Sequence, residues 1–311
     1  MAWFDTFDRL MAEQLPAVRV EKEAEMAKYT TFRIGGGAKR MVFPRQGEEV
    51  ARILEVCKAA GAAWFVLGRG SNLLISDQGL DCVVLNMAEL NEIQLEEGNV
   101  MYVQAGALLS RVAVQAQQAG LAGLAFAHGI PGSLGGAVVM NAGAYGGEMG
   151  QVVQEVTALF PEGLRTMKAE ELHYGYRHSI FSEEPGIVLA ARLQLQPGDP
   201  AEIRAEMDDL MARRKASQPL EYPSAGSTFK RPEGHYAGTM IDQCGLKGTA
   251  VGGAEVSTKH AGFIINKKNA TFSDVTELIE IVQDTVFRTF GVELEPEVKI
   301  IRAMENREED V

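Results

Sequence analysis

Glycines concentrated in one stretch are the residues of this sequence best suited to binding a ligand through the backbone. HGIPGSLGGAVVMNAGAYGG (128–147) contains seven glycines, interleaved with apolar residues such as Ile130 and Leu134. A flexible linker would carry more serine, threonine or charge, so these glycines indicate ordered geometry: a positive φ or a close approach of the backbone to another group. Tight packing between two elements is the structural alternative. The functional interpretation is a backbone cradle for a phosphate or a cofactor.

Two further glycine turns are FRIGGGA (32–38) and LGRGSNLLISDQG (67–79), and the second directly follows an apolar segment. Its first residues offer successive backbone N–H groups and a hydroxyl, a combination that suits phosphate oxygens. None of the three turns matches G-x-G-x-x-G or G-x-x-x-x-G-K-[ST], which disfavours a Rossmann dehydrogenase and a nucleoside triphosphatase. Two phosphate-type turns from different parts of the chain favour a long ligand that contains a pyrophosphate.

A basic cluster predicts a second anion site in an otherwise acidic chain. The net charge is −12 over 311 residues, which disfavours broad binding to nucleic acid or anionic membranes. The cluster comprises Arg213, Arg214, Lys215, Lys230 and Arg231, followed by Lys247 and Lys259. A solvated helix end explains Arg213 and Arg214 equally well. Lys230 and Arg231 follow the turn PSAGSTF, which is poorly suited to a generic surface.

Composition also limits the compartment and the partners. Cys57, Cys82 and Cys244 are widely spaced and form no CxxC motif, so we expect a reducing cytoplasm. The five histidines lack metal-ligand spacing, and no metal is predicted. The first residues lack a basic region, and no apolar run reaches the ~18 residues of a membrane span. We therefore expect no signal peptide and no stable membrane association. The oligomeric state stays open, with a monomer plausible.

The elements that must position these turns follow from apolar periodicity. A hairpin is predicted to turn at Glu97–Asn99, and PGDP at 197–200 is typical of a boundary. Helices are predicted over 4–15, 48–61, 108–120, 200–216, 236–245 and 273–291. Strands are predicted over 41–44, 63–68, 82–86, 152–160, 186–196, 261–266 and 297–302. This mixture predicts the α+β class.

Eight segments in one order over nearly the whole chain carry a resemblance to a known family. They are TTFRIGGGA, LGRGSNLL, FAHGIPGSLGGAVVMNAGAYGG, YRHSIF, QPLEYPSAGSTFKRP, IDQCGLKG, VSTKHAGFIIN and LEPEVKII. Together they resemble the UDP-N-acetylenolpyruvoylglucosamine reductase (MurB) family of bacterial cell-wall synthesis. The resemblance implies NADPH-dependent, FAD-mediated reduction of an enolpyruvyl ether to a lactyl ether. Hydride would pass from flavin N5 to the β-carbon, and a proton to the α-carbon.

The resemblance also implies a fold: a vanillyl-alcohol-oxidase-type (PCMH-type) FAD-binding fold of two subdomains, plus a C-terminal α/β substrate domain. We expect the flavin subdomains at 1–88 and 89–198, the substrate domain at 199–295 and a flexible tail at 304–311. A last strand, about 296–303, is expected to return to the first subdomain. Only SEEPG separates Phe181 from Ile187, so the chain resembles the short form that lacks a Tyr-bearing insertion.

The resemblance implies FAD held without a covalent bond, because Asn72 stands where many flavoproteins of the wider group use a histidine. The pyrophosphate is expected between the 68–72 turn and the 132–133 backbone, with the dipole of the following helix adding attraction. Tyr145 is expected near the isoalloxazine. The expected FAD contacts are Gly68, Arg69, Gly70, Ser71, Asn72, Gly132, Ser133, Gly136, Asn141, Gly143, Ala144 and Tyr145.

Three residues match the catalytic positions of the family. Arg177, in YR-x-S-x-F, would grip the substrate carboxylate; Ser227, in AGSTFK, would donate the proton; and Glu297, in LxPEV, matches the catalytic Glu. A structural ion pair, a turn cap and a strand-end carboxylate are the respective alternatives. The expected substrate contacts are Lys215, Lys230, Arg231, Lys247 and His260, the lysines near the UDP phosphates.

Two other functions are compatible with parts of the sequence. An FAD oxidase or dehydrogenase of the same fold could act on a carbohydrate or alcohol, but the PSAGSTFK and LEPEV motifs argue against it. A non-catalytic flavin- or nucleotide-binding module is the third reading, and the joint presence of Arg177, Ser227 and Glu297 argues against that.

Overall fold

The structure is a computed structural model that describes residues 2–303, and it divides into two compact units. The first contains the chain up to Val20, Val42–Arg69 and Val84–Arg214. The second contains Glu21–Met41, Gly70–Val83 and the chain from Lys215 on. The expected tail at 304–311 lies outside the described residues. Neither unit is continuous in sequence, and the α+β class predicted from periodicity is confirmed.

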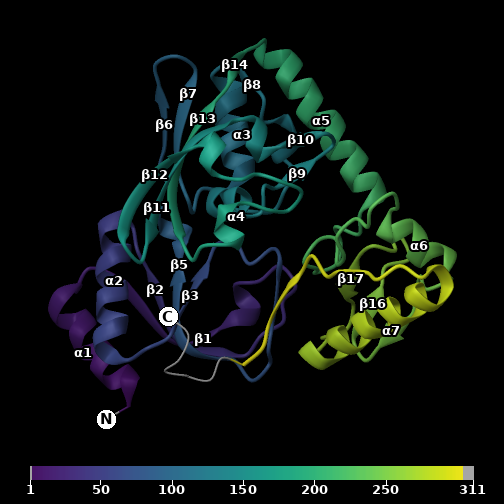
Figure 1. Ribbon diagram of the computed structural model, residues 1–311, viewed down its shortest axis with the longest axis horizontal. Helices are drawn as coiled ribbons and strands as arrows, with labels where there is room; N and C mark the ends of the chain where they lie inside the picture. The colour runs from purple at the N-terminus through teal and green to yellow at the C-terminus, as the bar shows by residue number, and fades with distance from the viewer. Residues whose placement is uncertain (1, 304–311) are drawn as a thin grey trace. The chain divides into compact units, whose positions relative to one another are not determined.

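The first unit is built on a five-stranded antiparallel sheet of order β12-β11-β13-β7-β6. Its strands are β6 (Ile93–Glu96), β7 (Val100–Gln104), β11 (Val153–Phe160), β12 (Gly163–Lys168) and β13 (Ile187–Gln194). In β11, Val153, Val156, Ala158 and Phe160 are buried, as expected of a strand with one face in the core. The hairpin β6–β7 turns at the predicted position, where Gly98 and Asn99 have positive φ (Figure 1).

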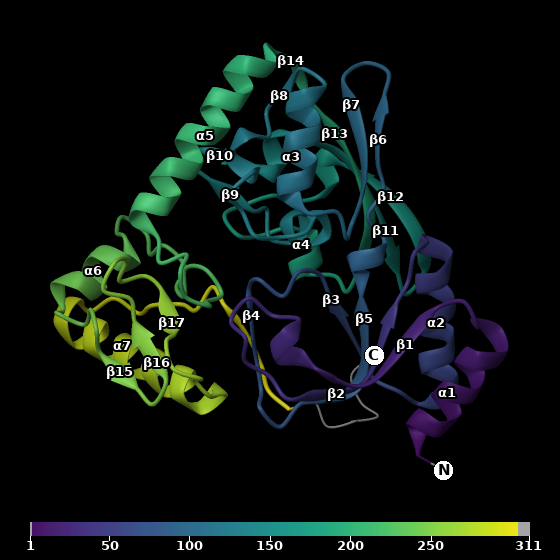
Figure 2. The same ribbon diagram turned by 180° about the vertical axis from the view of Figure 1, so that it is seen from behind.

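Helices and short strands complete the first unit. Helix α2 ends at Gly61, whose φ of 63° closes the last turn, and α5 runs as one uninterrupted helix (Figure 2). The helices are α1 (Trp3–Gln14), α2 (Gly47–Ala60), α3 (Leu109–Gln118), α4 (Leu134–Val139) and α5 (Pro200–Ser217), the last continuing into the second unit. The short strands are β8 (Leu121–Ala122), β9 (Gly143–Ala144), β10 (Gly147–Glu148) and β14 (Gln196–Pro197).

The second unit packs α7 against a three-stranded sheet of order β15-β16-β17 (Figure 1). Helix α7 begins at a capping box, in which Thr271 and Asp274 bond each other's backbone N–H groups. Its core-facing side includes Val275, Leu278 and Val282. The elements are α6 (Ala237–Gln243), β15 (Ala250–Val251), β16 (Ala254–Val256), β17 (Ile264–Asn266) and α7 (Phe272–Phe290).

Strand β18 (Lys299–Ile301) pairs in parallel with β4 (Leu73–Ile75), which lies among the first 88 residues (Figure 2). A further four-stranded sheet has the order β1-β2-β5-β3. Its strands are β1 (Arg19–Glu25), β2 (Gly37–Phe43), β3 (Trp64–Leu67) and β5 (Leu80–Asn86). The chain passes between the units within β1, β2 and β5. The domain boundaries given by the resemblance stay a prediction.

Several elements differ from the sequence expectation, and three of them show why. Strand β3 lies within an apolar stretch of the sequence, yet its first residue, Trp64, is 39% exposed. Strand β12, with the sequence GLRTMK, has only Met167 buried and gave no apolar signal. Strand β17 is shorter than the expected 261–266 segment. Within residues 2–303, no helix is long and apolar enough to cross a bilayer. That part of the chain likewise contains no acidic, histidine or cysteine cluster suited to a metal.

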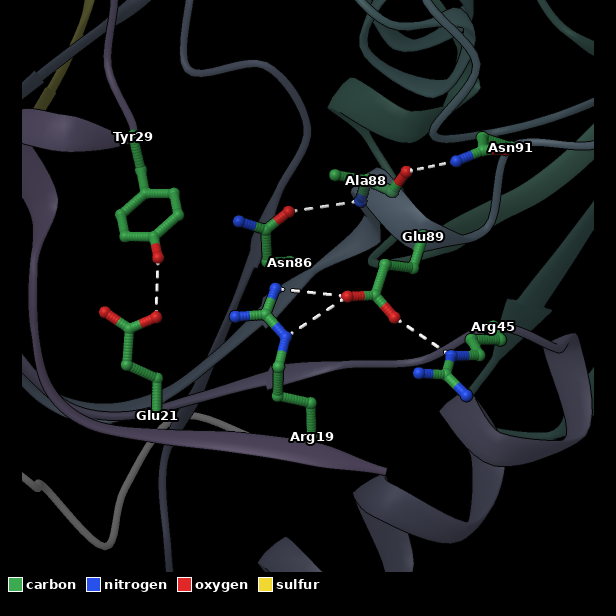
Figure 3. Close-up of polar contacts among 8 residues, drawn as sticks. All are labelled: Arg19, Glu21, Tyr29, Arg45, Asn86, Ala88, Glu89 and Asn91. Carbon is green, nitrogen blue, oxygen red and sulfur yellow. Dashed lines mark hydrogen bonds and ion pairs between the residues drawn. The ribbon is translucent and has the colours of Figure 1, made fainter. Parts of the chain in front are cut away.

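An ion-pair network stabilises the first unit (Figure 3). The Glu89 carboxylate accepts bonds from Arg19 (3.1 Å to Nη2) and from Arg45 (3.0 Å to Nε). The Arg19 guanidinium also lies 3.2 Å from the centroid of the Phe43 ring. Burial raises the pKa of Glu89, but the bonds from Arg45 and Arg19 outweigh it and leave the pKa below its ordinary value.

Replacing Glu89 by Gln tests this network. A carboxyl group whose folded pKa is lowered stabilises the fold above its unfolded pKa, about 4.3. That contribution is lost as the pH falls through the folded value. Glu89→Gln should lower the free energy of unfolding at pH 7 by on the order of 1 kcal/mol, and the difference should shrink in acid. Urea unfolding at pH 7 and in acid measures the difference in the free energy of unfolding. Glu13→Gln, which removes the carboxylate of an exposed ion pair, is the control. A pH-independent difference would contradict the assignment.

Candidate active site

A phosphate-binding position can be built from two residues of the first unit. Gly68 directly follows β3, and Ser133 directly precedes α4. Ser133 is 3% exposed, and its Oγ is buried without a hydrogen-bond partner among residues 2–303. A Cβ on Gly68 would lie 2.5 Å from that Oγ. A hydroxyl donor beside bare backbone suits an oxygen of a pyrophosphate, so these residues fit the FAD implied by the resemblance.

Helix α4 contributes less to this position than the sequence suggested. The N–H groups of Leu134 and Gly135 already donate to the carbonyls of Ala107 (2.9 Å) and Ala105 (2.8 Å). The helix has only six residues, so its dipole is small. A Cβ on Gly135 would lie 3.0 Å from the Ala105 Cβ, which makes this glycine a packing residue. Gly132 is half-buried and Gly136 exposed, so the stretch combines close packing with accessible backbone.

The hairpin β9–β10 presents Tyr145 at its tip. Ala144 pairs with Gly147, which leaves Tyr145 (φ 54°) and Gly146 (φ 88°) as the two turn residues. Positive φ at both positions is the geometry of tight two-residue hairpins. Gly147 packs on Phe126, where a Cβ would lie 2.5 Å from the ring. The Tyr145 side chain is 46% exposed and free to contact a flat ligand.

The second glycine turn is divided between the units: Gly68 and Arg69 belong to the first, and Gly70, Ser71 and Asn72 to the second. Gly70 has a φ of 65°, and a Cβ there would lie 2.2 Å from the Tyr29 carbonyl oxygen. Its glycine identity is therefore required by packing against the backbone. The Asn72 Nδ2 donates to the Glu297 carbonyl at 3.0 Å. Arg69 is exposed and Ser71 half-buried.

Arg177 lies in a strained turn of the first unit. The backbones of Gly175 and His178 bond each other in both directions, at 3.1 and 3.2 Å. Arg177 takes a φ of 53°, a left-handed conformation that costs free energy for a residue with a side chain. Its Nη2 donates to the Gly143 carbonyl at 3.2 Å, which ties it to the β9–β10 hairpin. The surrounding structure therefore fixes both the turn and the guanidinium.

Asn141 holds these two loops together. Its Nδ2 donates to the Gly175 carbonyl at 3.0 Å, and its Oδ1 accepts from the Gly150 N–H at 2.8 Å. The residue is 0% exposed. The FAD contact that the resemblance implies here stays a prediction. The buried side-chain amide is used in both directions within the protein, which gives Asn141 a positioning role. Sequence reasoning missed this role because the Gly175 partner is 34 residues away.

Ser227 and Glu297 are brought together in the second unit. The segments 227–230 and 295–298 run antiparallel. The Glu297 N–H donates to the Thr228 carbonyl (2.8 Å), and the Lys230 N–H donates to the Glu295 carbonyl (2.8 Å). Thr228 is also bonded to the backbone of Gly262 and Ile264. Ser227 is exposed beside Gly226, whose φ is 78°, and Glu297 is half-buried.

Three of the expected substrate cations of the second unit, Lys230, Lys247 and Arg231, have partners for their side chains. Lys230 forms an ion pair with Glu295, and Lys247 with Asp242 at 2.7 Å. The Arg231 guanidinium lies 4.4 Å from the centroid of the Tyr236 ring. The backbone carbonyl of Lys215 accepts a bond from the Lys259 ammonium group at 2.7 Å.

His260 has a defined tautomer. Its Nδ1 accepts from the Gly262 N–H at 3.1 Å, so the proton of the neutral ring lies on Nε2. Burial lowers the pKa of His260; a backbone hydrogen bond raises it in part, and the Lys247 charge lowers it further. The imidazole is therefore neutral at pH 7 and offers one N–H donor.

Comparison with known proteins relates both units to one family. Residues 218–301 match the model described as UDP-N-acetylenolpyruvoylglucosamine reductase, C-terminal domain, and residues 38–167 match the FAD binding domain. The reductase of Clostridium novyi is 50% identical over 89% of this chain and 90% of its own length. That of Geobacillus kaustophilus is 50% identical over 91% and 93%. The crystal structure of the Thermus caldophilus enzyme has a TM-score of 0.78 and 36% identity, covering 91% of this chain and 98% of that one.

Asn141→Asp removes the N–H that holds the Arg177 turn and places a carboxylate against the Gly175 carbonyl. We expect turnover of the enolpyruvyl substrate to fall roughly 10- to 100-fold, since losing a buried hydrogen bond costs about 1–3 kcal/mol. Bound FAD should stay near one per chain. Asn269→Asp is the matched control, because Asn269 also has positive φ but is exposed. Normal turnover in Asn141→Asp, or turnover lost only in proportion to FAD, would refute the positioning role.

Proposed function

We propose a residue-level mechanism for this chain, which belongs to the UDP-N-acetylenolpyruvoylglucosamine reductase family. The protein is an FAD-binding oxidoreductase of peptidoglycan precursor synthesis. It reduces UDP-N-acetylenolpyruvoylglucosamine to UDP-N-acetylmuramate with NADPH as the reductant. The observation that supports the residue roles best is the pairing of segments 227–230 and 295–298, which places Ser227 and Glu297 on neighbouring strands of backbone.

Arg177 is proposed to bind the enolpyruvyl carboxylate. When bound, FAD supplies the hydride that reaches the β-carbon of the substrate. Negative charge then develops at the α-carbon and spreads into the carboxylate. A guanidinium offers two parallel donors to a carboxylate and stays protonated, so it can stabilise this charge as it grows. The ties to Gly143 and the closed turn hold it in place before the reaction.

Ser227 is proposed to donate the proton to the α-carbon. A serine hydroxyl is a weak acid in water, so it can serve only a strongly basic carbon from which water is excluded. Gly226, with its positive φ, sets the direction of the turn that exposes Ser227. Glu297 is proposed as the accompanying catalytic carboxyl group. Its backbone is fixed by Thr228 and by the Asn72 amide.

The basic residues of the second unit are proposed to bind the UDP-sugar. Lys215, Lys230 and Lys247 would serve its phosphates, with Lys230 and Lys247 exchanging a carboxylate partner for a phosphate. Arg231 and the Nε2–H of His260 would complete the contacts. We also propose that the enzyme works in the cytoplasm. The three free thiols of the described residues agree with a reducing compartment.

FAD should be released by denaturation, because the amide of Asn72 offers no nucleophile for a flavin linkage. About one FAD per chain is expected in the supernatant after acid precipitation, measured by its absorbance. Yellow colour retained in the washed precipitate would contradict the non-covalent proposal.

Ser227→Ala should separate the two halves of the catalytic cycle. Bleaching of the flavin by NADPH needs no proton from Ser227, so stopped-flow reduction should keep its rate. Reoxidation by the enolpyruvyl substrate should slow by roughly 10²–10⁴, the usual loss for a missing general acid. Ser227→Cys should retain more activity, since a thiol can still donate a proton. Reoxidation of the alanine variant at the wild-type rate would show that Ser227 is only a turn residue, and Glu297 would be tested next.

A further inference from the structure

One arginine of helix α5 is half-buried without an anionic partner. Two other arginines of the helix form ion pairs with carboxylates four residues away. Arg204 pairs with Asp208, and Arg213 pairs with Asp209. Arg214 has neither a carboxylate nor a hydrogen-bond acceptor within residues 2–303. Burial lowers the pKa of Arg214, an effect that Tyr145 opposes. A guanidinium partly removed from water with no acceptor is costly unless a ligand supplies the anion.

The Arg214 side chain lies on the glycine-rich stretch of the first unit. Its Cδ is 3.1 Å and its Nη1 3.6 Å from the position that a Cβ on Gly129 would take. The absence of a side chain at Gly129 thus lets the arginine rest against the backbone. The preceding His128 has a buried Nδ1 that is also without a partner in the described chain. Two unsatisfied side chains therefore adjoin the same glycine, four residues before Ser133.

We propose that Arg214 is a binding residue for a phosphate group of FAD in the first unit. This rests on the FAD binding of the proposed function and extends it to a residue beyond the matched FAD binding domain, which ends at 167. The planar guanidinium can form two parallel bonds to phosphate oxygens. FAD is favoured over the UDP-sugar because Gly129, Tyr145 and Ser133 all belong to the first unit. The cations proposed for the substrate belong to the second.

Apoprotein titrations with FAD and with riboflavin test this. Riboflavin carries the isoalloxazine but no phosphate, so it reports on contacts other than the phosphate contact. In Arg214→Met the Kd for FAD should rise roughly 10- to 100-fold, the usual range for a charge-assisted bond. The Kd for riboflavin should not change. Arg213→Met is the matched control: it is the next residue on the same helix and is paired with Asp209, and its FAD affinity should equal that of the wild type.

Two further variants guard against a folding defect. Arg214→Lys keeps the charge but loses the two parallel N–H donors of the guanidinium, and should give an intermediate Kd for FAD. Gly129→Ala keeps the arginine but displaces its side chain, and should weaken the binding of FAD more than the binding of riboflavin. The melting temperature of each apoprotein should match that of the wild type.

Several outcomes would overturn the inference. An unchanged Kd for FAD in Arg214→Met would do so, even if the KM for the UDP-sugar rose, which would assign Arg214 to the substrate. Equal weakening of FAD and riboflavin would make Arg214 a packing residue. Failure of the wild-type apoprotein to bind FAD would instead contradict the proposed function itself.

Discussion

Close approach of one backbone to another is the constraint on which the second unit depends. A Cβ on Gly36 would lie 2.2 Å from the Asp77 carbonyl oxygen, and the Gly36 N–H donates to the Ser76 carbonyl at 2.9 Å. The same segment reaches the turn before Ser227, since the Thr31 hydroxyl donates to the Ser224 carbonyl at 2.7 Å. Glycines that permit contact between backbones thus fix β4, its partner β18 and the segment before Ser227 in one arrangement. The sites of Ser227 and Glu297 follow from that packing.

The parts of the fold that were predictable are those with a local cause. Helix α2 shows its apolar face and its terminal Gly61 in the sequence, and the β6–β7 hairpin shows its turn residues. The FRIGGGA turn could be read as a packing or a ligand-binding element. The structure shows close packing at Gly36. The sequence could not decide between the two, because the atoms that exclude a side chain at Gly36 belong to Asp77, 41 positions along the chain. The FAD contact expected at Asn141 stays a prediction. Its positioning contacts could not be read from the sequence, because Gly175 and Gly150 become its partners only in the tertiary fold.

The residues proposed to act in catalysis differ in how the protein holds them. Arg177 occupies a strained left-handed conformation, which costs of order 1–3 kcal/mol and persists only where the surroundings fix it. The closed turn, the Asn141 amide and the Gly143 carbonyl provide that fixation. Ser227 is held by its neighbour: Thr228 bonds two other segments, 262–264 and 297–298, while the serine side chain stays exposed. The Ser227 hydroxyl stays exposed because the structural bonds fall on Thr228, whereas the Arg177 guanidinium is itself bonded to the Gly143 carbonyl.

The basic residues differ in whether the free protein already supplies them with an anionic partner. Lys230 and Lys247 already have carboxylate partners, so binding a phosphate exchanges one anion for another and leaves little unpaired charge in the free protein. That exchange weakens the net gain from each lysine but favours a ligand of higher charge over a monoanion. Arg214 has no such partner, and its half-buried charge is compensated only when an anion binds. An arginine of this kind can contribute more binding free energy per contact than the paired lysines, because it gives up no carboxylate partner and part of its desolvation precedes ligand binding.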